Sequence, residues 1–426
     1  MTEELACYDV AAEQVTINGV AYSQPMEDTE TYMTIAGEVT VKRHLYRPAG
    51  RGTRHVCPLE LRAGIIEGFF TPAAARQAAY VVAHMPPATG AALFNELGSM
   101  RPSPSSLERL PKGLSARWEA HRQDWETQLR SFESVPTSAT TLVVSLDGVL
   151  APIRSATAEK AEPTVLDKQP TGPKGYQEVG CGTVSLHDAA GERLQTVRYG
   201  RMPERKKITL CQELEAEVQA ILAVQPRLKL VKLADGARDN WRFLDQLNLG
   251  VPAAQIESWE IVDYYHACDH LKHALALIWG EQTPAAKAEF ARLKTILKET
   301  DGGVERVIET LRYRVRKAKG HQREQLRKEL TYFRNQRHRM NYAAYLRENL
   351  PIASGVVEAA CKTLVKQRLK QSGMRWKTQG GQAILTLRSL IQSERWERGW
   401  ALLRGSYQQT VWVGAAEAYF KLPLAA

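Results

Sequence analysis

The chain has 426 residues, of which 44% are hydrophobic, and a formal net charge of +10. This length is enough for two or three domains that each have a hydrophobic core. No run of about 18 apolar residues is present, so we expect no transmembrane helix. The acidic start lacks the basic and then apolar order of a secretory signal. The six cysteines form no Cys-x-x-Cys pair, which argues against a structural zinc site and favours a reduced, cytoplasmic protein.

The positive charge is concentrated in two segments. Residues 311–340 hold eleven Lys or Arg and two Glu, and residues 360–377 hold six Lys or Arg and no acidic residue. A local excess of one sign in helical segments favours a polyanionic partner such as nucleic acid. The alternative interpretation is a solvated helix face that has no partner.

The first 135 residues predict a small β region followed by helices. Residues 14–48 alternate between apolar and polar side chains, and Gly37 and Glu38 separate two arms, which predicts a hairpin. A break at 98–102 between two helices is compatible with a helix-turn-helix, although a helical bundle without DNA-binding function has the same pattern. The helices are expected over 59–66, from Thr71 as an N-cap, from Pro87, over 103–110 and over 117–132.

From residue 140 the pattern indicates alternating strands and helices. The order β-β-β-α-β-α-β-α is that of a ribonuclease-H-like mixed α/β sheet, in which the first strand lies beside the fourth. Strands are expected at 141–146, 182–187, 194–199, 228–234 and 256–262, helices at 209–224, 238–247 and 264–279, and a loop from 147 to about 178.

After Glu281 the sequence is helical and polar to about Asn349, which indicates an all-helical insertion. A loop then leads into a helix with Ser354 as its N-cap, and the tail from Ser389 is expected to pack on the core. The expected domains are a β-hairpin region (1–54), a helical and potentially DNA-binding region (55–135), the first part of the catalytic core (136–280), the basic insertion (281–350), and the completion of the core with its tail (351–426).

Two aspartates, Asp147 and Asp235, each close an apolar run and precede a glycine. A carboxylate just past a strand stands at the rim of a sheet, where ligands usually bind. Two such carboxylates on neighbouring strands repel each other unless a cation lies between them. The pattern therefore predicts a divalent-metal site for phosphoryl transfer. The alternative is that each is an ordinary turn aspartate.

Beyond the insertion stands Glu358. Two strand aspartates followed by a helical glutamate resemble the catalytic triad of DDE transposases. Several segments resemble one group of bacterial insertion-sequence transposases, the ISKra-type, over roughly residues 55–400. These segments are Val144–Gly148, Ala234–Ala237 with Trp241, Ile261–His266, Ser354–Glu358 and Ser372–Trp376.

The resemblance implies a function. Asp147, Asp235 and Glu358 would hold two Mg²⁺ ions, for which Mn²⁺ would substitute, and the enzyme would cleave and transfer DNA strands. Its partners would be double-stranded DNA, at terminal inverted repeats and at the target, and further copies of itself on that DNA. The resemblance implies neither a nucleotide cofactor nor a membrane, and it places the protein in the bacterial cytoplasm at the nucleoid.

Several residues near the triad have alternative interpretations. Glu358 is spaced for a helical ion pair with Lys362, and Glu348 is a competing third ligand. The pair Asp263 and His266 resembles an Asp-x-x-His element that supports many DDE active sites. Its alternative is a helix-cap aspartate and a core histidine. Cys268 and His270 complete no convincing metal set, and Asp239 and Asp269 are expected at the surface.

Aromatic residues accompany the basic residues. Tyr313, Tyr332 and Phe333 could stack on exposed bases, and Trp376 could stabilise a flipped base. Packing is the alternative for each of them. The residues expected to contact DNA are Arg312, Arg314, Arg316, Lys317, Lys319, Lys362, Lys366, Arg375 and Trp376.

Two other functions fit the sequence. One is a ribonuclease-H-like nuclease or junction resolvase, which hydrolyses DNA without joining it. The N-terminal helices and the long insertion favour the transposase, since a plain nuclease has less need to recognise DNA ends. The other is a domesticated, catalytically silent DNA-binding protein, against which the three intact carboxylates argue.

Overall fold

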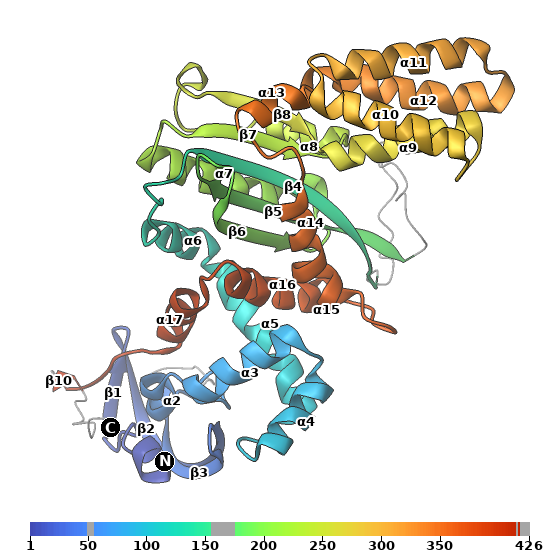
Figure 1. The fold of residues 1–426 in the computed structure, drawn as a ribbon. Coiled ribbons are helices and arrows are strands. Elements are labelled where there is room, and N and C mark those ends of the chain that lie inside the picture. Colours follow the sequence, from blue (N-terminus) through green and yellow to red (C-terminus); the bar gives the residue numbers. More distant parts are fainter. Residues whose placement is uncertain (49–54, 155–174, 415, 418–426) are drawn as a thin grey trace, which may run out of the picture. The chain divides into compact units, whose positions relative to one another are not determined.

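The structure is a computed structural model that describes residues 1–48, 55–154, 175–414 and 416–417 (Figure 1). The chain divides into two compact units. Unit 1 combines Met1–Leu129 with Gln379–Ala426, and unit 2 is Arg130–Thr378. In the described part of the chain, no helix has the length and apolar character needed to cross a membrane.

A five-stranded sheet in the order β10-β9-β1-β2-β3 belongs to unit 1. Its hairpin was predicted, but Thr34 pairs with Gly37, so the turn lies at residues 35–36 and not at Gly37 and Glu38. The Thr34 hydroxyl causes this placement, because it donates to the Gly37 carbonyl (2.7 Å) and closes the shorter turn. The strands are β1 (Gln14–Ile17), β2 (Val20–Thr34), β3 (Gly37–Pro48), β9 (Val411–Val413) and β10 (Ala416–Glu417).

Three helices of unit 1 pack on one another: α3 (Pro72–His84), α4 (Pro87–Leu97) and α5 (Pro104–Ala120). Helix α5 is longer than predicted because its buried face continues through Pro111. Ser103 caps α5, whereas the Thr71 hydroxyl makes no cap hydrogen bond to α3 and donates to the Met33 carbonyl. The remaining helices wholly or mainly in unit 1 are α1 (Thr2–Ala6), α2 (Pro58–Ala63), α6 (Arg122–Ser131), α16 (Thr378–Gln392) and α17 (Trp396–Tyr407).

The C-terminal tail belongs to unit 1, which corrects the expected domain 351–426. Side chains of α16 and α17 share a hydrophobic core with α3, α4 and α5. The apolar face of the tail was expected to pack on the catalytic core, but it is buried against the N-terminal helices. The tail residues in this core are Leu387, Leu390, Trp396, Trp400, Leu403 and Tyr407.

Unit 2 is a mixed α/β unit whose sheet has the order β6-β5-β4-β7-β8. Strand β4 is antiparallel to β5 and parallel to β7, so the first strand lies beside the fourth, as predicted. The alternation of strands and helices is also as predicted. The elements are β4 (Thr141–Pro152), β5 (Tyr176–His187), β6 (Arg193–Arg201), η1 (Arg205–Lys207), α7 (Ile208–Val224), β7 (Lys229–Ala234), α8 (Arg238–Asp245), η2 (Ala253–Gln255), β8 (Ser258–Val262) and α9 (Tyr264–Trp279).

The predicted loop from 147 to about 178 is shorter at both ends. Residues 147–152 continue β4, and residues 176–178 begin β5, because these two strands pair with each other up to Pro152 and Tyr176. The middle of that loop, at 155–174, lies outside the described residues.

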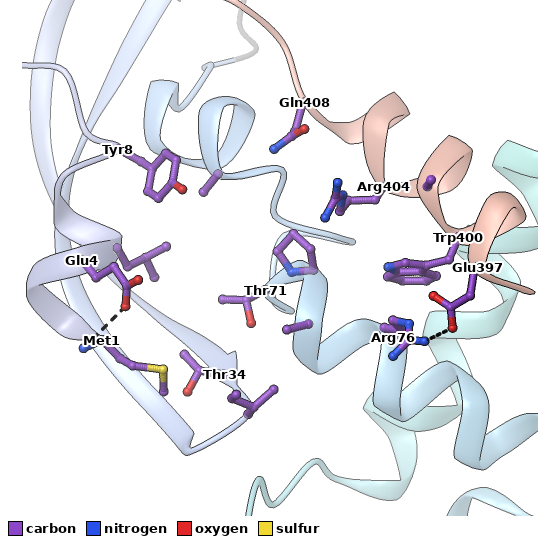
Figure 2. Close-up of a pocket in the computed structure, with 16 residues that line it drawn as sticks. Met1, Glu4, Tyr8, Thr34, Thr71, Arg76, Glu397, Trp400, Arg404 and Gln408 are labelled. Atoms are coloured by element: carbon purple, nitrogen blue, oxygen red, sulfur yellow. Dashed lines mark hydrogen bonds and ion pairs between the residues drawn. The ribbon is translucent and has the colours of Figure 1, made fainter. Parts of the chain in front are cut away.

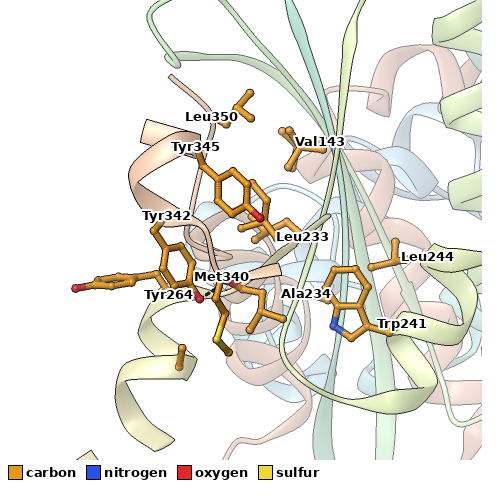
Figure 3. Packing of buried hydrophobic residues seen from close by; sticks show 14 of the residues in the cluster. Val143, Leu233, Ala234, Trp241, Leu244, Tyr264, Met340, Tyr342, Tyr345 and Leu350 are labelled. Carbon is orange, nitrogen blue, oxygen red and sulfur yellow. Dashed lines mark hydrogen bonds between the residues drawn. The ribbon is translucent and has the colours of Figure 1, made fainter. Parts of the chain in front are cut away.

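The helical insertion shares the core of unit 2. Its basic segment 311–340 covers the second half of one helix, a complete second helix and a short 3₁₀ turn. Figure 3 shows Met340, Tyr342 and Tyr345 in the same buried cluster as Val143 and Leu233 of the sheet. The insertion and the residues that follow form α10 (Pro284–Glu299), α11 (Gly303–Lys317), α12 (Gly320–Gln336), η3 (Arg337–Arg339), α13 (Tyr342–Arg347), α14 (Gly355–Ala360), η4 (Cys361–Lys366) and α15 (Gln367–Leu369).

Tyr342 connects the insertion to the sheet by one hydrogen bond. Its hydroxyl is fully buried and donates to the Val262 carbonyl at the end of β8 (2.9 Å). Tyr342→Phe is expected to lower the free energy of unfolding by about 1–2 kcal/mol, because the hydrogen bond is lost within the core. Urea denaturation measures this change. Tyr265→Phe is the control, since Tyr265 is 59% exposed; an equal loss in both variants would contradict the prediction.

Candidate active site

A cavity of about 950 Å³ in unit 2 contains all three predicted catalytic carboxylates, those of Asp147, Asp235 and Glu358. They come from β4, from the turn after β7 and from α14, which are far apart in the sequence. The lining also includes His266 and Asp269 of α9, so Asp269 is a cavity residue and not only a surface acid as expected. The structure therefore places the three predicted carboxylates, and a fourth from Asp269, around one space.

Asp147 was predicted to lie just past the end of its strand, but it lies inside strand β4. Strand β4 continues to Pro152 because the antiparallel ladder with β5 continues, with Asp147 opposite Cys181. The parallel ladder between β4 and β7 ends earlier, at Ser145 opposite Leu233. Asp147 and Asp235 each follow that last pair by two residues, so both stand just beyond the point where the parallel strands separate.

The Asp147 carboxylate is held by two hydrogen bonds. Its Oδ1 accepts from the Gly148 amide (2.6 Å), and its Oδ2 accepts from the Cys361 thiol (3.5 Å). Burial raises the pKa of Asp147, and the negative charge of Asp235 raises it further. The two aspartates thus destabilise each other as anions, and a cation between them would relieve that cost.

Asp235 is fixed by the first turn of α8. Its Oδ1 accepts from the Ala237 amide and from Asn240 Nδ2, both at 3.1 Å, and Trp241 Nε1 donates to its carbonyl (2.6 Å). Asn240 also donates to the Leu146 carbonyl in β4 (3.4 Å). Asn240 was not predicted as a site residue, because its one signal in the sequence is a polar side chain on the inward face of the helix.

Glu358 makes a contact that differs from the ion pair given as its alternative interpretation. Its Oε1 accepts from the Ser354 hydroxyl (2.8 Å), and the ion pairs found among the described residues include none between Glu358 and Lys362. Ser354 is the N-cap residue of α14, as expected, but its hydroxyl makes no cap hydrogen bond to the helix backbone and donates to Glu358 instead. Lys362 and Lys366 line the same cavity, on the π-helical turn η4.

The competing ligand Glu348 lies elsewhere. It pairs with Lys229 Nζ at 2.5 Å, at the first residue of β7, whereas Asp235 follows the last residue of that strand. This placement favours Glu358 over Glu348 as the third acidic residue of the cavity.

Asp263 joins two segments that contribute His266 and Ser354 to the cavity lining. Its Oδ1 accepts from the His266 amide (2.6 Å) and so caps α9, which confirms the helix-cap interpretation. Its Oδ2 accepts from the Ser354 amide, at the entrance to the helix of Glu358. Asp263 is 1% exposed, while His266 lines the cavity. One carboxylate therefore fixes both the start of α9 and the start of α14.

The donor set fits a hard divalent cation. The cavity offers carboxylate oxygens, the ligands preferred by Mg²⁺ and Mn²⁺, and the half-buried Asp147 is close to the like charge of Asp235. In the described part of the chain, no three His, Cys, Asp or Glu side chains are grouped closely enough to hold one metal ion. A joint metal site of all three acids therefore stays a prediction.

The predicted DNA-contacting residues are divided between the cavity and other surfaces. Lys362 and Lys366 are exposed and line the cavity. Arg314 lies over the Trp279 ring (4.3 Å), and Lys317 lies over the Tyr313 ring (4.4 Å). Trp376 is half-buried and donates to the Leu369 carbonyl (3.1 Å), which favours the packing interpretation. The other predicted DNA-contacting residues are exposed: Arg312, Arg316, Lys319 and Arg375.

A second cavity, of about 660 Å³, lies in unit 1 and contains none of the predicted catalytic residues. Figure 2 shows Arg76 and Glu397 in contact on its wall, with Trp400 and Arg404 of α17 beside them. This cavity lies between N-terminal elements and the C-terminal helix that the sequence analysis assigned to the core.

Among known proteins, the similarity found is structural and distant. No family model matches the sequence, and no curated protein matches it. A solved structure, a Drosophila P element transposase strand transfer complex, aligns with a TM-score of 0.38 and 10% sequence identity, over 75% of this chain and 91% of that chain. A TM-score this low does not establish a shared fold.

Proposed function

We propose that this chain is a DDE-type transposase of an insertion sequence, which binds terminal inverted repeats and cleaves and transfers DNA strands. The observation that carries the proposal is the meeting of Asp147, Asp235 and Glu358 in one cavity beside a sheet of order β6-β5-β4-β7-β8. The sequence segments that resemble ISKra-type transposases support the same proposal.

The acidic residues would act as the metal-binding group. Asp147, Asp235 and Glu358 are the residues that would hold the divalent ions. Bound Mg²⁺ supplies a nucleophilic hydroxide at neutral pH and relieves charge on the leaving oxygen. Because the ligands themselves transfer no proton, the same residues can direct water in hydrolysis and a DNA 3′-hydroxyl in strand transfer.

Basic residues would bind the DNA backbone. Lys362 and Lys366 lie on the wall of the cavity, where their ammonium groups would neutralise phosphates beside the scissile bond. In unit 1, the packed helices α3, α4 and α5 are the proposed recognition module. The exposed Arg101 and Arg109 flank the capped start of α5, which is the part of a recognition helix that contacts DNA.

Strand cleavage tests the proposal. We would incubate the protein with labelled duplexes from the DNA on both sides of its coding sequence, with Mg²⁺ or with EDTA. Wild type is expected to cut and join strands only with Mg²⁺. Asp147→Asn, Asp235→Asn and Glu358→Gln are expected to bind these duplexes without cutting, and Glu348→Gln is the matched control that keeps activity.

Other results of the cleavage experiment would support a different function or a different third ligand. Cleavage without joining would support the nuclease or resolvase. Binding without metal-dependent cleavage by wild type would support the silent DNA-binding protein. Normal cleavage by Glu358→Gln would remove Glu358 from the triad and make Asp269, which shares the cavity, the next residue to replace.

A further inference from the structure

Helix α12 of the insertion packs on the turn that carries Asp235. An added Cβ at Gly236 would lie 2.3 Å from Tyr332 Cε2, so only a glycine fits beneath this ring. Gln336, one helical turn after Tyr332, donates to the Gly236 carbonyl (3.4 Å). Two neighbouring side chains of α12 therefore contact the residue next to a proposed metal ligand.

The Tyr332 ring also packs against a histidine cluster. The His270 ring stacks on it, with centroids 3.7 Å apart and planes 19° apart. His270 Nδ1 lies 2.7 Å from Glu329 Oε2, and His273 Nδ1 lies 2.8 Å from Glu329 Oε1. Glu329 precedes Tyr332 by one helical turn, so α9 and α12 together fix the position of the ring.

The Tyr332 hydroxyl is buried and has no hydrogen-bond partner among the described residues. Burial raises the pKa of Tyr332, and the negative charges of Asp235 and Asp263 raise it further, so the phenol stays protonated. A buried unpaired hydroxyl destabilises a fold, and phenylalanine would fill the same space without that cost. Packing alone does not explain why this position holds tyrosine.

We propose that Tyr332 is a positioning residue of the catalytic cavity. Its ring fixes the Asp235–Gly236 turn, and its unpaired hydroxyl would donate a hydrogen bond toward Asp235 when that carboxylate holds a divalent cation. The inference rests on the proposed function. It makes the insertion part of the metal site, in addition to any contact that its basic residues make with DNA. Groups that orient metal ligands typically change metal affinity about 10–100-fold when removed.

The test compares Mn²⁺ binding and stability in the full-length protein. Free Mn²⁺ is measured by electron paramagnetic resonance for wild type, Tyr332→Phe and Asp235→Asn, with Tyr313→Phe as matched control because Tyr313 is 51% exposed. Tyr332→Phe is expected to bind Mn²⁺ about 10-fold more weakly, with a melting temperature in EDTA at least as high as that of wild type. Tyr313→Phe is expected to match wild type in both measurements.

Gly236→Ala provides a second route to the same site, because its methyl group displaces the Tyr332 ring, and it should also weaken Mn²⁺ binding. Wild-type affinity in Tyr332→Phe would overturn the inference and leave the proposed function intact, provided that Asp235→Asn loses binding. Failure of wild type to bind Mn²⁺, or unchanged binding in Asp235→Asn, would overturn the proposed metal site and this inference with it.

Discussion

Asp147→Asn is expected to stabilise the protein in EDTA while lowering metal-dependent DNA cleavage by about 10³-fold or more. The stabilisation follows from the environment of Asp147, where burial and the nearby Asp235 disfavour a negative charge. The loss of cleavage corresponds to about 4 kcal/mol of transition-state stabilisation, since an amide is a poor ligand for a hard cation. This substitution therefore distinguishes the effect of the Asp147 charge on stability from its effect on DNA cleavage.

The stabilisation depends on pH in a defined direction. The pKa of Asp147 is raised in the folded state, so the folded protein holds this proton more tightly than the unfolded chain. The free energy of unfolding of wild type therefore falls as the pH rises from the unfolded pKa through the folded pKa. Asp147→Asn lacks this dependence, so its advantage over wild type should be largest above the folded pKa and vanish below the unfolded one.

Chemical denaturation across this pH range, with EDTA or with Mg²⁺, measures the effect. At a Mg²⁺ concentration of about 100 times the dissociation constant, wild type should gain about 2.7 kcal/mol, and Asp147→Asn should gain much less. Asp239→Asn is the control, because Asp239 is an exposed acid on α8 that pairs with Arg242. Equal stabilisation of wild type and Asp147→Asn by Mg²⁺ would contradict the assignment of Asp147 as a ligand.

The local pattern of apolar and polar residues was sufficient to predict most strands of unit 2 and their order. Apolar runs predicted β4 and β7, and the order of the predicted strands placed β4 beside β7. That pairing is what brings Asp147 and Asp235 to the same level of the sheet. The strand ends were less predictable, since Asp147 continues β4 only because β5 extends beside it.

Contacts between distant segments could not be predicted from local pattern. Whether Glu358 or Glu348 faces the cavity depends on the ion pairs and hydrogen bonds that each makes with distant residues. An ion pair with Lys229 keeps Glu348 at the opposite end of β7 from Asp235. Asn240 and Cys361 contact the two aspartates from α8 and η4, and neither has a periodic signal. The same limit explains why the C-terminal tail was assigned to the wrong unit. The pattern of an amphipathic helix shows that one face is buried, but it does not show which element covers that face.

Trp400→Ala is expected to lower the free energy of unfolding of unit 1 by about 3–5 kcal/mol, the usual cost of removing a large buried aromatic side chain. Trp400 is 5% exposed, and its ring lies 5.6 Å from that of Trp396, within the core shared by α17 and the N-terminal helices. Hydrogen exchange followed by mass spectrometry should show lost protection in α3, α4 and α5 but not in β4 or β7. Trp412→Ala, at a 40% exposed position, should change stability by about 0.5 kcal/mol or less. Retained protection of α3–α5 in Trp400→Ala would mean that the tail does not stabilise the N-terminal helices, and the division of the chain into these two units would then be wrong.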